Sequence, residues 1–239
     1  SMLKAVLFDL DGTLLGNNMM EDFVPPYFAK LSARMSAHVR PDRLIAAIRK
    51  ASDAIAESDG SQTNEEAFAE VFYAHLGKSR EMLEPHLMDF YVHDFPTLRE
   101  FTHRKPAARK VVEAAFAMDY KVAIATNPFF PEVAIQERMR WAGVQDFPYD
   151  RVTTYENSHF AKPDLRYFEE VLEALGCVPS QALMVGDQAM DMVAAELGCR
   201  TFLVPSGATE SELDAPDPDD RGELIDVLPV LTREQPASS

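Results

Sequence analysis

The sequence is poor in cysteine, tryptophan and positive charge. Its 239 residues include two cysteines and one tryptophan, and 23 Lys and Arg stand against 39 Asp and Glu. A chain of this length can bury a full hydrophobic core without disulfides or structural metal. So few cysteines favour cytoplasmic chemistry, and we expect Cys177 and Cys199 to act as small buried hydrophobic residues, with a disulfide between them left open.

The formal net charge of −16 argues against several classes of partner. Nucleic acids and anionic membranes are polyanions that repel such a chain, so we expect neither as a partner. No run of 18 apolar residues is present to span a membrane, and the N-terminus lacks the basic, apolar, small-residue order of a secretory signal. We therefore expect a cytoplasmic protein that is a monomer or a weak homodimer.

Short apolar runs separated by helix-like segments indicate the fold class. Five runs are typical of buried parallel strands: Ala5–Phe8, Val122–Ala125, Val152–Thr154, Ala182–Val185 and Thr201–Val204. Three of the helix-like segments open with proline, which is favoured at the first helical position: Pro106–Met118, Pro131–Trp141 and Pro163–Leu175. The alternation predicts an α/β fold with a doubly wound, mainly parallel, Rossmann-like sheet.

The stretch from about Gly16 to Phe95 interrupts this alternation, because it contains no convincing strand. Four helix-like segments fill it: Glu21–Ala37, Pro41–Glu57, Asn64–Leu76 and Ser79–Tyr91. We therefore predict a helical domain at residues 16–98, inserted after the first strand of a core domain formed by residues 1–15 and 99–239. The acidic stretch Thr209–Asp226 is expected to be a surface loop without chemistry.

Two carboxylates directly follow the first predicted strand, in the segment Asp9-Leu10-Asp11-Gly12. Extended backbone places residues i and i+2 on one side, and ligands bind at the carboxyl ends of strands in open α/β sheets. Adjacent carboxylates repel each other unless a cation, a shared proton or solvent intervenes, and such oxygen ligands suit Mg²⁺. A simple turn is the ordinary alternative, and metal-dependent glycosyltransferases and glycosidases also use carboxylate pairs.

Three further short patterns lie near predicted strand ends or helix starts. Thr126-Asn127 offers a hydroxyl and backbone amides that can hold a phosphate oxygen, and Lys162 precedes a predicted helix. Asp187 follows another strand, with Asp191 one helical turn later. Each has an ordinary alternative: a turn, a solvated charge or a helix cap. Together they predict one sheet edge that holds a cation, a phosphate-sized anion and a free carboxylate.

At these residues the sequence resembles the haloacid dehalogenase (HAD) superfamily of phosphotransferases. All four motifs of that family occur in order: Asp9-Leu10-Asp11-Gly12-Thr13, Thr126-Asn127, Lys162-Pro163 and Gly186-Asp187-x-x-x-Asp191. The helical insertion between the first two motifs is similar to the first cap type of the family, called C1. The interval between Asn127 and Lys162 is too short for the other common cap.

The resemblance implies roles for the four aspartates. Asp9 would be the nucleophile that forms an aspartyl-phosphate, and Asp11 would be the general acid and base. The cofactor Mg²⁺ would be held by the Asp9 carboxylate, the Asp11 backbone carbonyl and Asp187. Asp191 would orient a metal-bound water or the lysine of the third motif.

The resemblance also implies that Thr126, Asn127 and Lys162 bind the transferring phosphoryl group. Dehalogenases of the family lack the second aspartate of the first motif, so Asp11 argues for phosphoryl transfer. Many relatives have serine at the position of Gln188 in this chain. The resemblance therefore still implies a metal site, but it does not fix the contacts that surround the metal.

The leading hypothesis is a Mg²⁺-dependent phosphatase that hydrolyses a small organic phosphate monoester, with a small phosphorylated metabolite as its partner. A sugar phosphomutase of the same superfamily would carry the same motifs and is the alternative. A non-enzymatic phospho-acceptor or sensor is the second alternative. Receiver domains of that kind are about half this length and place the acceptor aspartate after the third strand, where this chain has Tyr155-Glu156.

Overall fold

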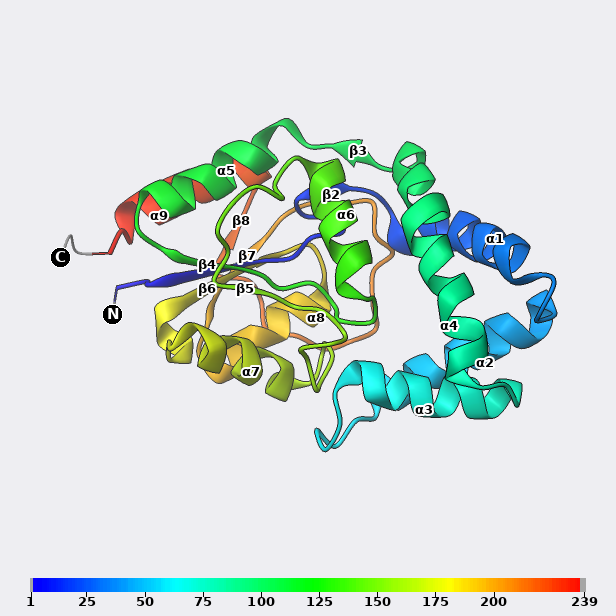
Figure 1. The fold of residues 1–239 in the computed structure, drawn as a ribbon. Helices are drawn as coiled ribbons and strands as arrows, with labels where there is room; N and C mark the ends of the chain where they lie inside the picture. The colour runs from blue at the N-terminus through cyan, green and yellow to red at the C-terminus, as the bar shows by residue number, and fades with distance from the viewer. Residues whose placement is uncertain (1, 237–239) are drawn as a thin grey trace.

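A six-stranded parallel sheet forms the centre of the computed structural model, which describes residues 2–236 (Figure 1). All paired neighbours in this sheet are parallel. In spatial order the strands are β5 (Arg151–Val152), β4 (Lys121–Ile124), β1 (Ala5–Phe8), β6 (Ala182–Gly186), β7 (Arg200–Leu203) and β8 (Asp220–Arg221). The predicted α/β class with a mainly parallel sheet is confirmed.

The strand order reverses direction at β1. From β1 the chain runs outward to β4 and β5, and it then crosses back to β6 on the other side of β1 before continuing to β7 and β8. Ligands of doubly wound sheets bind where the strand order reverses, outside the carboxyl ends of the strands. The topology therefore directs attention to the ends of β4, β1 and β6.

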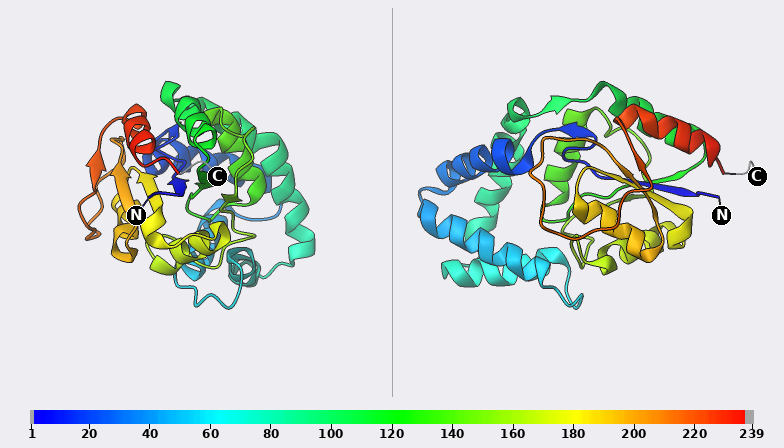
Figure 2. Two further views of the ribbon diagram at one scale, coloured as in Figure 1. Left: turned by 90° about the vertical axis from the view of Figure 1, so that its left-hand side faces the viewer. Right: turned by 180° about the vertical axis from the view of Figure 1, so that it is seen from behind.

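Helices cover both faces of the sheet (Figures 1 and 2). One face carries α5 (Pro106–Ala117), α6 (Glu132–Ala142) and α9 (Val227–Arg233), and the other carries α7 (Leu165–Leu175), α8 (Ala189–Met192) and the 3₁₀ turn Val193–Leu197. Along β1, Val6 and Phe8 join one hydrophobic core while Ala5 and Leu7 join the other. Because both faces of the strand are buried, its sequence is apolar throughout instead of alternating.

The helical insertion lies to one side of the sheet, between β2 (Leu15–Gly16) and β3 (His103–Arg104), which pair antiparallel (Figure 1). Its elements are the short π-helix Met19–Phe23, α1 (Val24–Met35), α2 (Pro41–Ala56), α3 (Asn64–Leu76), α4 (Arg80–Asp89), the short π-helix Phe90–Asp94 and the 3₁₀ helix Phe95–Phe101. We call residues 16–98 the cap segment below. The division of the chain into two domains at these residues stays a prediction.

Some of the sequence-based expectations are wrong in their detail. Neither Pro131 nor Pro163 takes the first helical position, because Pro131 is the N-cap of α6 and α7 begins only after its own N-cap, Asp164. The acidic stretch Thr209–Asp226 is not entirely loop, since it contains β8. Carboxylates attach this strand to the sheet: Asp219 Oδ2 accepts from the Thr201 backbone N–H at 2.9 Å, and Asp220 pairs with the Arg200 guanidinium.

The two cysteines are free thiols. Cys199 is buried, as expected, whereas Cys177 is only half-buried. Among residues 2–236, no helix combines the length and the apolar character that a membrane span requires.

Asn64, at the start of α3, fastens the cap segment to the core. This side chain is fully buried, and its Nδ2 donates to the carbonyl oxygens of Pro128 at 3.2 Å and Phe160 at 3.1 Å. Its backbone N–H donates to Ser158 O at 2.8 Å, and that of Glu65 donates to a neighbouring core carbonyl at 2.7 Å. A single turn of α3 is thus bonded to the loops that follow β4 and β5.

We expect Asn64→Ala to loosen this attachment. The substitution leaves two buried carbonyl groups without their amide donor, which costs about 1–3 kcal/mol of unfolding free energy. For a chain of this size the melting temperature should fall by roughly 2–4 °C per kcal/mol. Hydrogen exchange should become faster in the backbone of α3 than in α5.

The matched control is Gln62→Ala, which removes an exposed amide hydrogen bond to Glu70 close to the same turn. It should leave both measurements near the wild-type values. Equal effects of the two substitutions would contradict the role assigned to Asn64.

Candidate active site

The carboxyl ends of three neighbouring strands bring the predicted site residues together. Phe8, the last residue of β1, is in register with Ile124 of β4 and with Val185 of β6. The next residues along the chain therefore meet at one edge: Asp9 from β1, Thr126 after β4, and Asp187 after β6. The parallel register explains how residues more than 170 positions apart come to share one site.

Three carboxylates form a cluster at this edge. Oxygen atoms of Asp9, Asp187 and Asp191 all lie within 4.8 Å of one another, and Asp191 is fully buried. The Thr13 hydroxyl lies 3.3 Å from Asp9 Oδ2 and 3.2 Å from Asp187 Oδ1. Burial, together with the charges of Asp9 and Asp191, raises the pKa of the Asp187 carboxyl well above its usual range. Hard oxygen donors of this kind are suited to a divalent cation.

Lys162 supplies the positive charge inside this cluster. Its Nζ donates to Asp191 Oδ1 at 2.6 Å and to Asp9 Oδ1 at 3.1 Å, and its side chain is 1% exposed. Burial alone would lower the pKa of Lys162, but the charges of Asp191 and Asp9 outweigh it and raise the pKa. The lysine therefore stays protonated, and one cation faces three carboxylates.

Asp191 differs from the other two carboxylates because it is fully buried and because backbone N–H groups bind one of its oxygen atoms. Oδ1 accepts from Lys162, and Oδ2 accepts from the backbone N–H groups of Asp187 and Gln188 at 3.2 Å each. Burial and the charge of Asp9 raise the pKa of Asp191, while Lys162 opposes that rise. These contacts suit a residue that orients the lysine and the loop, and they leave Asp9 and Asp187 as the carboxylates with freedom to bind a cation.

Two glycines let the loops approach these carboxylates closely. Gly12 has φ +83°, and a Cβ atom there would lie 2.2 Å from Asp187 Oδ2. A Cβ atom at Gly186 would lie 2.4 Å from atoms of the Asp191 side chain. Any larger residue at either position would displace a carboxylate of the cluster.

The second residue pair from the sequence, Thr126-Asn127, faces the lysine. Thr126 is buried, and its carbonyl oxygen accepts from the hydroxyls of Thr153 at 2.6 Å and Tyr167 at 2.9 Å, which hold the end of β4 in place. Asn127 Oδ1 accepts from the Lys162 backbone N–H at 3.0 Å. The second and third motifs are therefore joined directly by a hydrogen bond.

The Asp11 side chain lies apart from the acidic cluster and binds a residue that sequence reasoning missed. Its Oδ1 accepts from Asn17 Nδ2 at 3.0 Å, and its Oδ2 pairs with Arg138 Nη1. Arg138 lies on α6 with its side chain 1% exposed, and its guanidinium stands 4.7 Å from the centre of the Phe130 ring. Within residues 2–236, its Nε and Nη2 have no hydrogen-bond partner.

A sequence signal for Arg138 did exist. The buried positions of α6 include Ala134, Ile135, Met139 and Ala142, and position 138 falls among them on the same face. A charged residue at an apolar position of an amphipathic helix is unusual unless it is paired. That spacing marks Arg138 as a residue with a buried partner.

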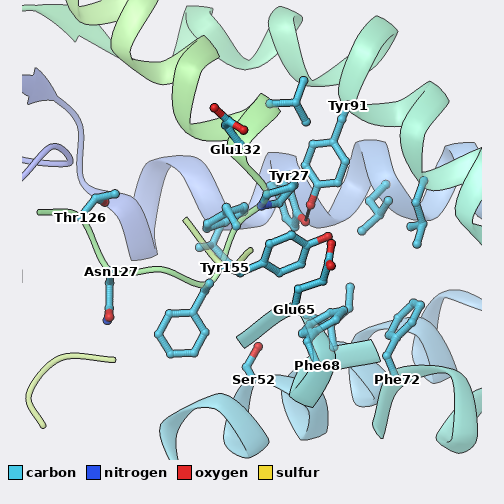
Figure 3. A pocket seen from close by; sticks show the side chains of 18 of the residues that line it. Tyr27, Ser52, Glu65, Phe68, Phe72, Tyr91, Thr126, Asn127, Glu132 and Tyr155 are labelled. Atoms are coloured by element: carbon cyan, nitrogen blue, oxygen red, sulfur yellow. Dashed lines mark hydrogen bonds between the residues drawn. The ribbon is translucent and has the colours of Figure 1, made fainter. Parts of the chain in front are cut away.

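A cavity of about 1070 Å³ lies between the cap segment and the core (Figure 3). Asp9, Asp11, Thr126, Asn127 and Lys162 are among its lining residues. Figure 3 shows Thr126 and Asn127 at one end, with the aromatic side chains of the cap segment extending away from them. The cavity thus connects the polar sheet edge to the helical insertion.

Comparisons with known proteins agree with this geometry. A family model for haloacid dehalogenase-like hydrolases matches residues 3–197. The chain is 26% identical over 219 residues to glyceraldehyde 3-phosphate phosphatase of Methanothermobacter thermautotrophicus, covering 89% of this chain and 90% of that protein. It is also 26% identical over 241 residues to phosphoglycolate phosphatase of Vibrio vulnificus, covering 95% and 97% of the two chains. The crystal structure of a HAD phosphatase from Thermococcus onnurineus has a similar fold, with a TM-score of 0.58, 22% identity and coverage of 98% and 100%.

The acidic cluster predicts that Asp187→Asn stabilises the metal-free protein. The pKa of Asp187 is higher in the native state than in the unfolded chain, so the carboxyl loses its proton more easily when the chain is unfolded. Ionisation of this group therefore favours unfolding, and it destabilises the native state increasingly as the pH rises above the ordinary pKa of an aspartate. Asn cannot ionise, so we expect a gain of about 1–3 kcal/mol in unfolding free energy at pH 8 with chelator present. The gain should vanish well below about pH 3.9, the ordinary pKa of an aspartate, where both states hold the proton.

The same variant should lose stabilisation by millimolar Mg²⁺, which we expect to raise the melting temperature of the wild type. The control Asp217→Asn alters a fully exposed carboxylate and should change neither result. A lower melting temperature for Asp187→Asn in chelator at pH 8 would contradict this account of the cluster.

Proposed function

The chain belongs to the haloacid dehalogenase-like hydrolase family, and from this premise we propose that it is a Mg²⁺-dependent phosphatase that hydrolyses an organic phosphate monoester through an aspartyl-phosphate. The observation that carries the proposal is the position of Asp9, which lies within 3.1 Å of a buried lysine and beside two further carboxylates. The names of the relatives support phosphate esters as the substrate class. We place the activity in the cytoplasm, on a phosphorylated metabolite.

The donor set fits the proposed metal. Asp9 and Asp187 carboxylate oxygens, with the backbone carbonyl of Asp11, would hold Mg²⁺ by the hard oxygen ligands that this ion prefers. When bound, the ion supplies positive charge that offsets the charge of the phosphoryl oxygens. The excess of carboxylates over Lys162 in the buried cluster is the observation that calls for such an ion.

In the first step, an Asp9 carboxylate oxygen attacks phosphorus and the bond from phosphorus to the ester oxygen breaks. Asp11 donates a proton to that departing oxygen, so the alcohol leaves neutral. Lys162 Nζ, the Thr126 hydroxyl and the Asn127 backbone N–H hold the phosphoryl oxygens in place. Because phosphoryl transfer depends mainly on positioning and charge stabilisation, these fixed donors account for most of what the protein contributes.

In the second step, Asp11 removes a proton from a water molecule, which attacks the phosphorus of the aspartyl-phosphate. The bond between phosphorus and the Asp9 oxygen breaks, inorganic phosphate leaves, and both aspartates return to their starting states. The contacts of Asp11 with Asn17 and Arg138 hold its carboxylate at the cavity, where both proton transfers are needed. The cap segment reduces access of bulk water to this end of the cavity.

We expect Asp9→Asn to abolish turnover. An amide is a far weaker nucleophile than a carboxylate, so phosphate release from phenyl phosphate with Mg²⁺ should fall at least about 1000-fold, and chelation should have a similar effect on the wild type. The control Asp42→Asn changes an exposed carboxylate on α2 and should keep full activity.

The products of this assay separate the phosphatase from its alternatives. Free phosphate identifies a hydrolase, a rearranged sugar ester without free phosphate identifies a mutase, and a lasting phosphoprotein without turnover identifies a sensor. Full phosphate release by a folded Asp9→Asn variant would sink the proposed mechanism.

Arg138 is proposed as a positioning residue that acts through Asp11. In Arg138→Met the acid is no longer held at the leaving oxygen, so kcat for phenyl phosphate should fall by about 10²-fold, the size of a typical general-acid effect, with a smaller change in KM. The loss should be much smaller for 4-nitrophenyl phosphate, whose leaving group needs no proton. Arg138→Lys should recover part of the activity.

This pattern separates positioning from a purely structural role. A variant that is merely unstable would lose activity equally on both esters, and that result would contradict the role assigned to Arg138. Melting curves of the two variants provide the check on folding.

A further inference from the structure

The cavity that ends at the phosphate-binding residues is large and mainly apolar. Its volume of about 1070 Å³ is at the upper end of the roughly 300–1,000 Å³ typical of sites for drug-sized ligands. The cap segment contributes many of the apolar side chains that line it, among them Met19, Phe28, Leu31, Phe68, Phe72 and Leu87. Burial of a small, polar substrate would leave most of this apolar surface without a partner.

Two of the hydroxyl groups in the aromatic part of the cavity already satisfy each other. The hydroxyls of Tyr27 and Tyr91 are 2.9 Å apart and bonded to each other, as Figure 3 shows. Burial raises the pKa of Tyr27 to about 12 and that of Tyr91 well above its usual value, so both rings stay neutral. With these hydroxyls paired, the rings offer mainly carbon surface to a ligand.

The cations that line the cavity are also largely engaged. Arg138 pairs with Asp11 through Nη1, and the two donors that lack a partner in the described part of the chain, Nε and Nη2, are buried away from the cavity surface. Arg80 pairs with Glu84 and lies 3.6 Å from Glu65. Lys162 is held by the acidic cluster described above. The remaining lining cation, Arg49, is exposed.

Further carboxylates, from Asp53, Glu132 and Glu156, also line the cavity. A second anionic group on the substrate would therefore meet more negative than positive charge there, and among the described lining residues it would find no buried cation without a carboxylate partner. That environment disfavours an ester that carries a carboxylate in addition to its phosphate, such as phosphoglycolate.

We propose that the substrate is a phosphate monoester whose alcohol part is large, apolar and free of a second negative charge. The inference rests on the proposed phosphatase function and narrows it to a substrate class. The phosphoryl group would lie at the strand ends, while the apolar part would extend between the aromatic side chains of the cap segment. Apolar contacts of this kind are worth about a fourfold change in kcat/KM per buried methylene.

A series of 4-alkylphenyl phosphates tests the proposal with leaving groups of nearly constant basicity. From phenyl phosphate to 4-butylphenyl phosphate, we expect kcat/KM to rise at least about thirtyfold, since four methylene-sized groups are buried. The nearly isosteric 4-(2-carboxyethyl)phenyl phosphate should be at least about tenfold poorer than the butyl compound, because its carboxylate enters an acidic cavity. A flat series, or equal rates for the butyl and carboxyethyl esters, would overturn the proposal.

A pair of variants on α3 tests the location of the apolar part. Ala69 is half-buried and lines the cavity, whereas Ala74 is exposed on the same helix. Ala69→Trp should reduce the ratio of kcat/KM between 4-butylphenyl and phenyl phosphate at least about tenfold, because the new side chain occupies the space of the tail. Ala74→Trp should leave that ratio unchanged.

If Ala69→Trp does not fold, as judged by circular dichroism, Ala69→Leu provides a smaller filling group and should reduce the same ratio by a smaller factor. An unchanged ratio in a folded Ala69 variant would overturn the assignment.

The two proposals can fail separately. Phosphate release from every ester, irrespective of its tail, would leave the phosphatase proposal standing and refute this inference alone. Absence of phosphate release from all of the esters, by folded protein with Mg²⁺, would refute the phosphatase proposal and this inference with it.

Discussion

The contact of the Lys162 ammonium with Asp9 and Asp191 is the interaction around which the site is organised. Three carboxyl groups and one lysine gather at the end of β1, where Lys162, Asp9 and Asp191 are buried and Asp187 is half-buried. Buried charges are costly unless they are paired and hydrogen-bonded. The backbone N–H groups at Asp191 and the close approach at Gly12 are therefore part of the same electrostatic arrangement.

Much of the core could be predicted from the sequence because its signals are local. Apolar runs such as Ala5–Phe8 are buried on both faces, and parallel pairing then brings the residues that follow them to one edge. The placement of Arg138 and the start of α7 after Pro163 could not be predicted with the same means. The first depends on a partner 127 positions away, and in the second the Asp164 side chain caps the helix by accepting from the Arg166 backbone N–H, so that Pro163 lies before the helix.

The cap segment shows a different limit of sequence reasoning. The apolar faces of its helices are visible in the sequence as periodic patterns. The pattern does not distinguish residues that pack in the core from residues that line the cavity, because both occur at the same helical spacing. Phe72 of α3, for example, is nearly fully buried and also lines the cavity. Motifs on the strand ends therefore identify the chemistry, whereas the shape that selects a ligand depends on how two segments distant in sequence come together.

Asn64 has a further consequence, because its two acceptors belong to the loops that hold Asn127 and Lys162, two of the proposed phosphate-binding residues. Pro128 directly follows Asn127, and Phe160 lies two residues before Lys162. Any motion that lifts α3 from the core must break these bonds and release both loops. If the proposed phosphatase function holds, binding of a phosphoryl group to these loops would stabilise the attachment of α3, and a firmer attachment of α3 would in turn strengthen that binding by the same factor.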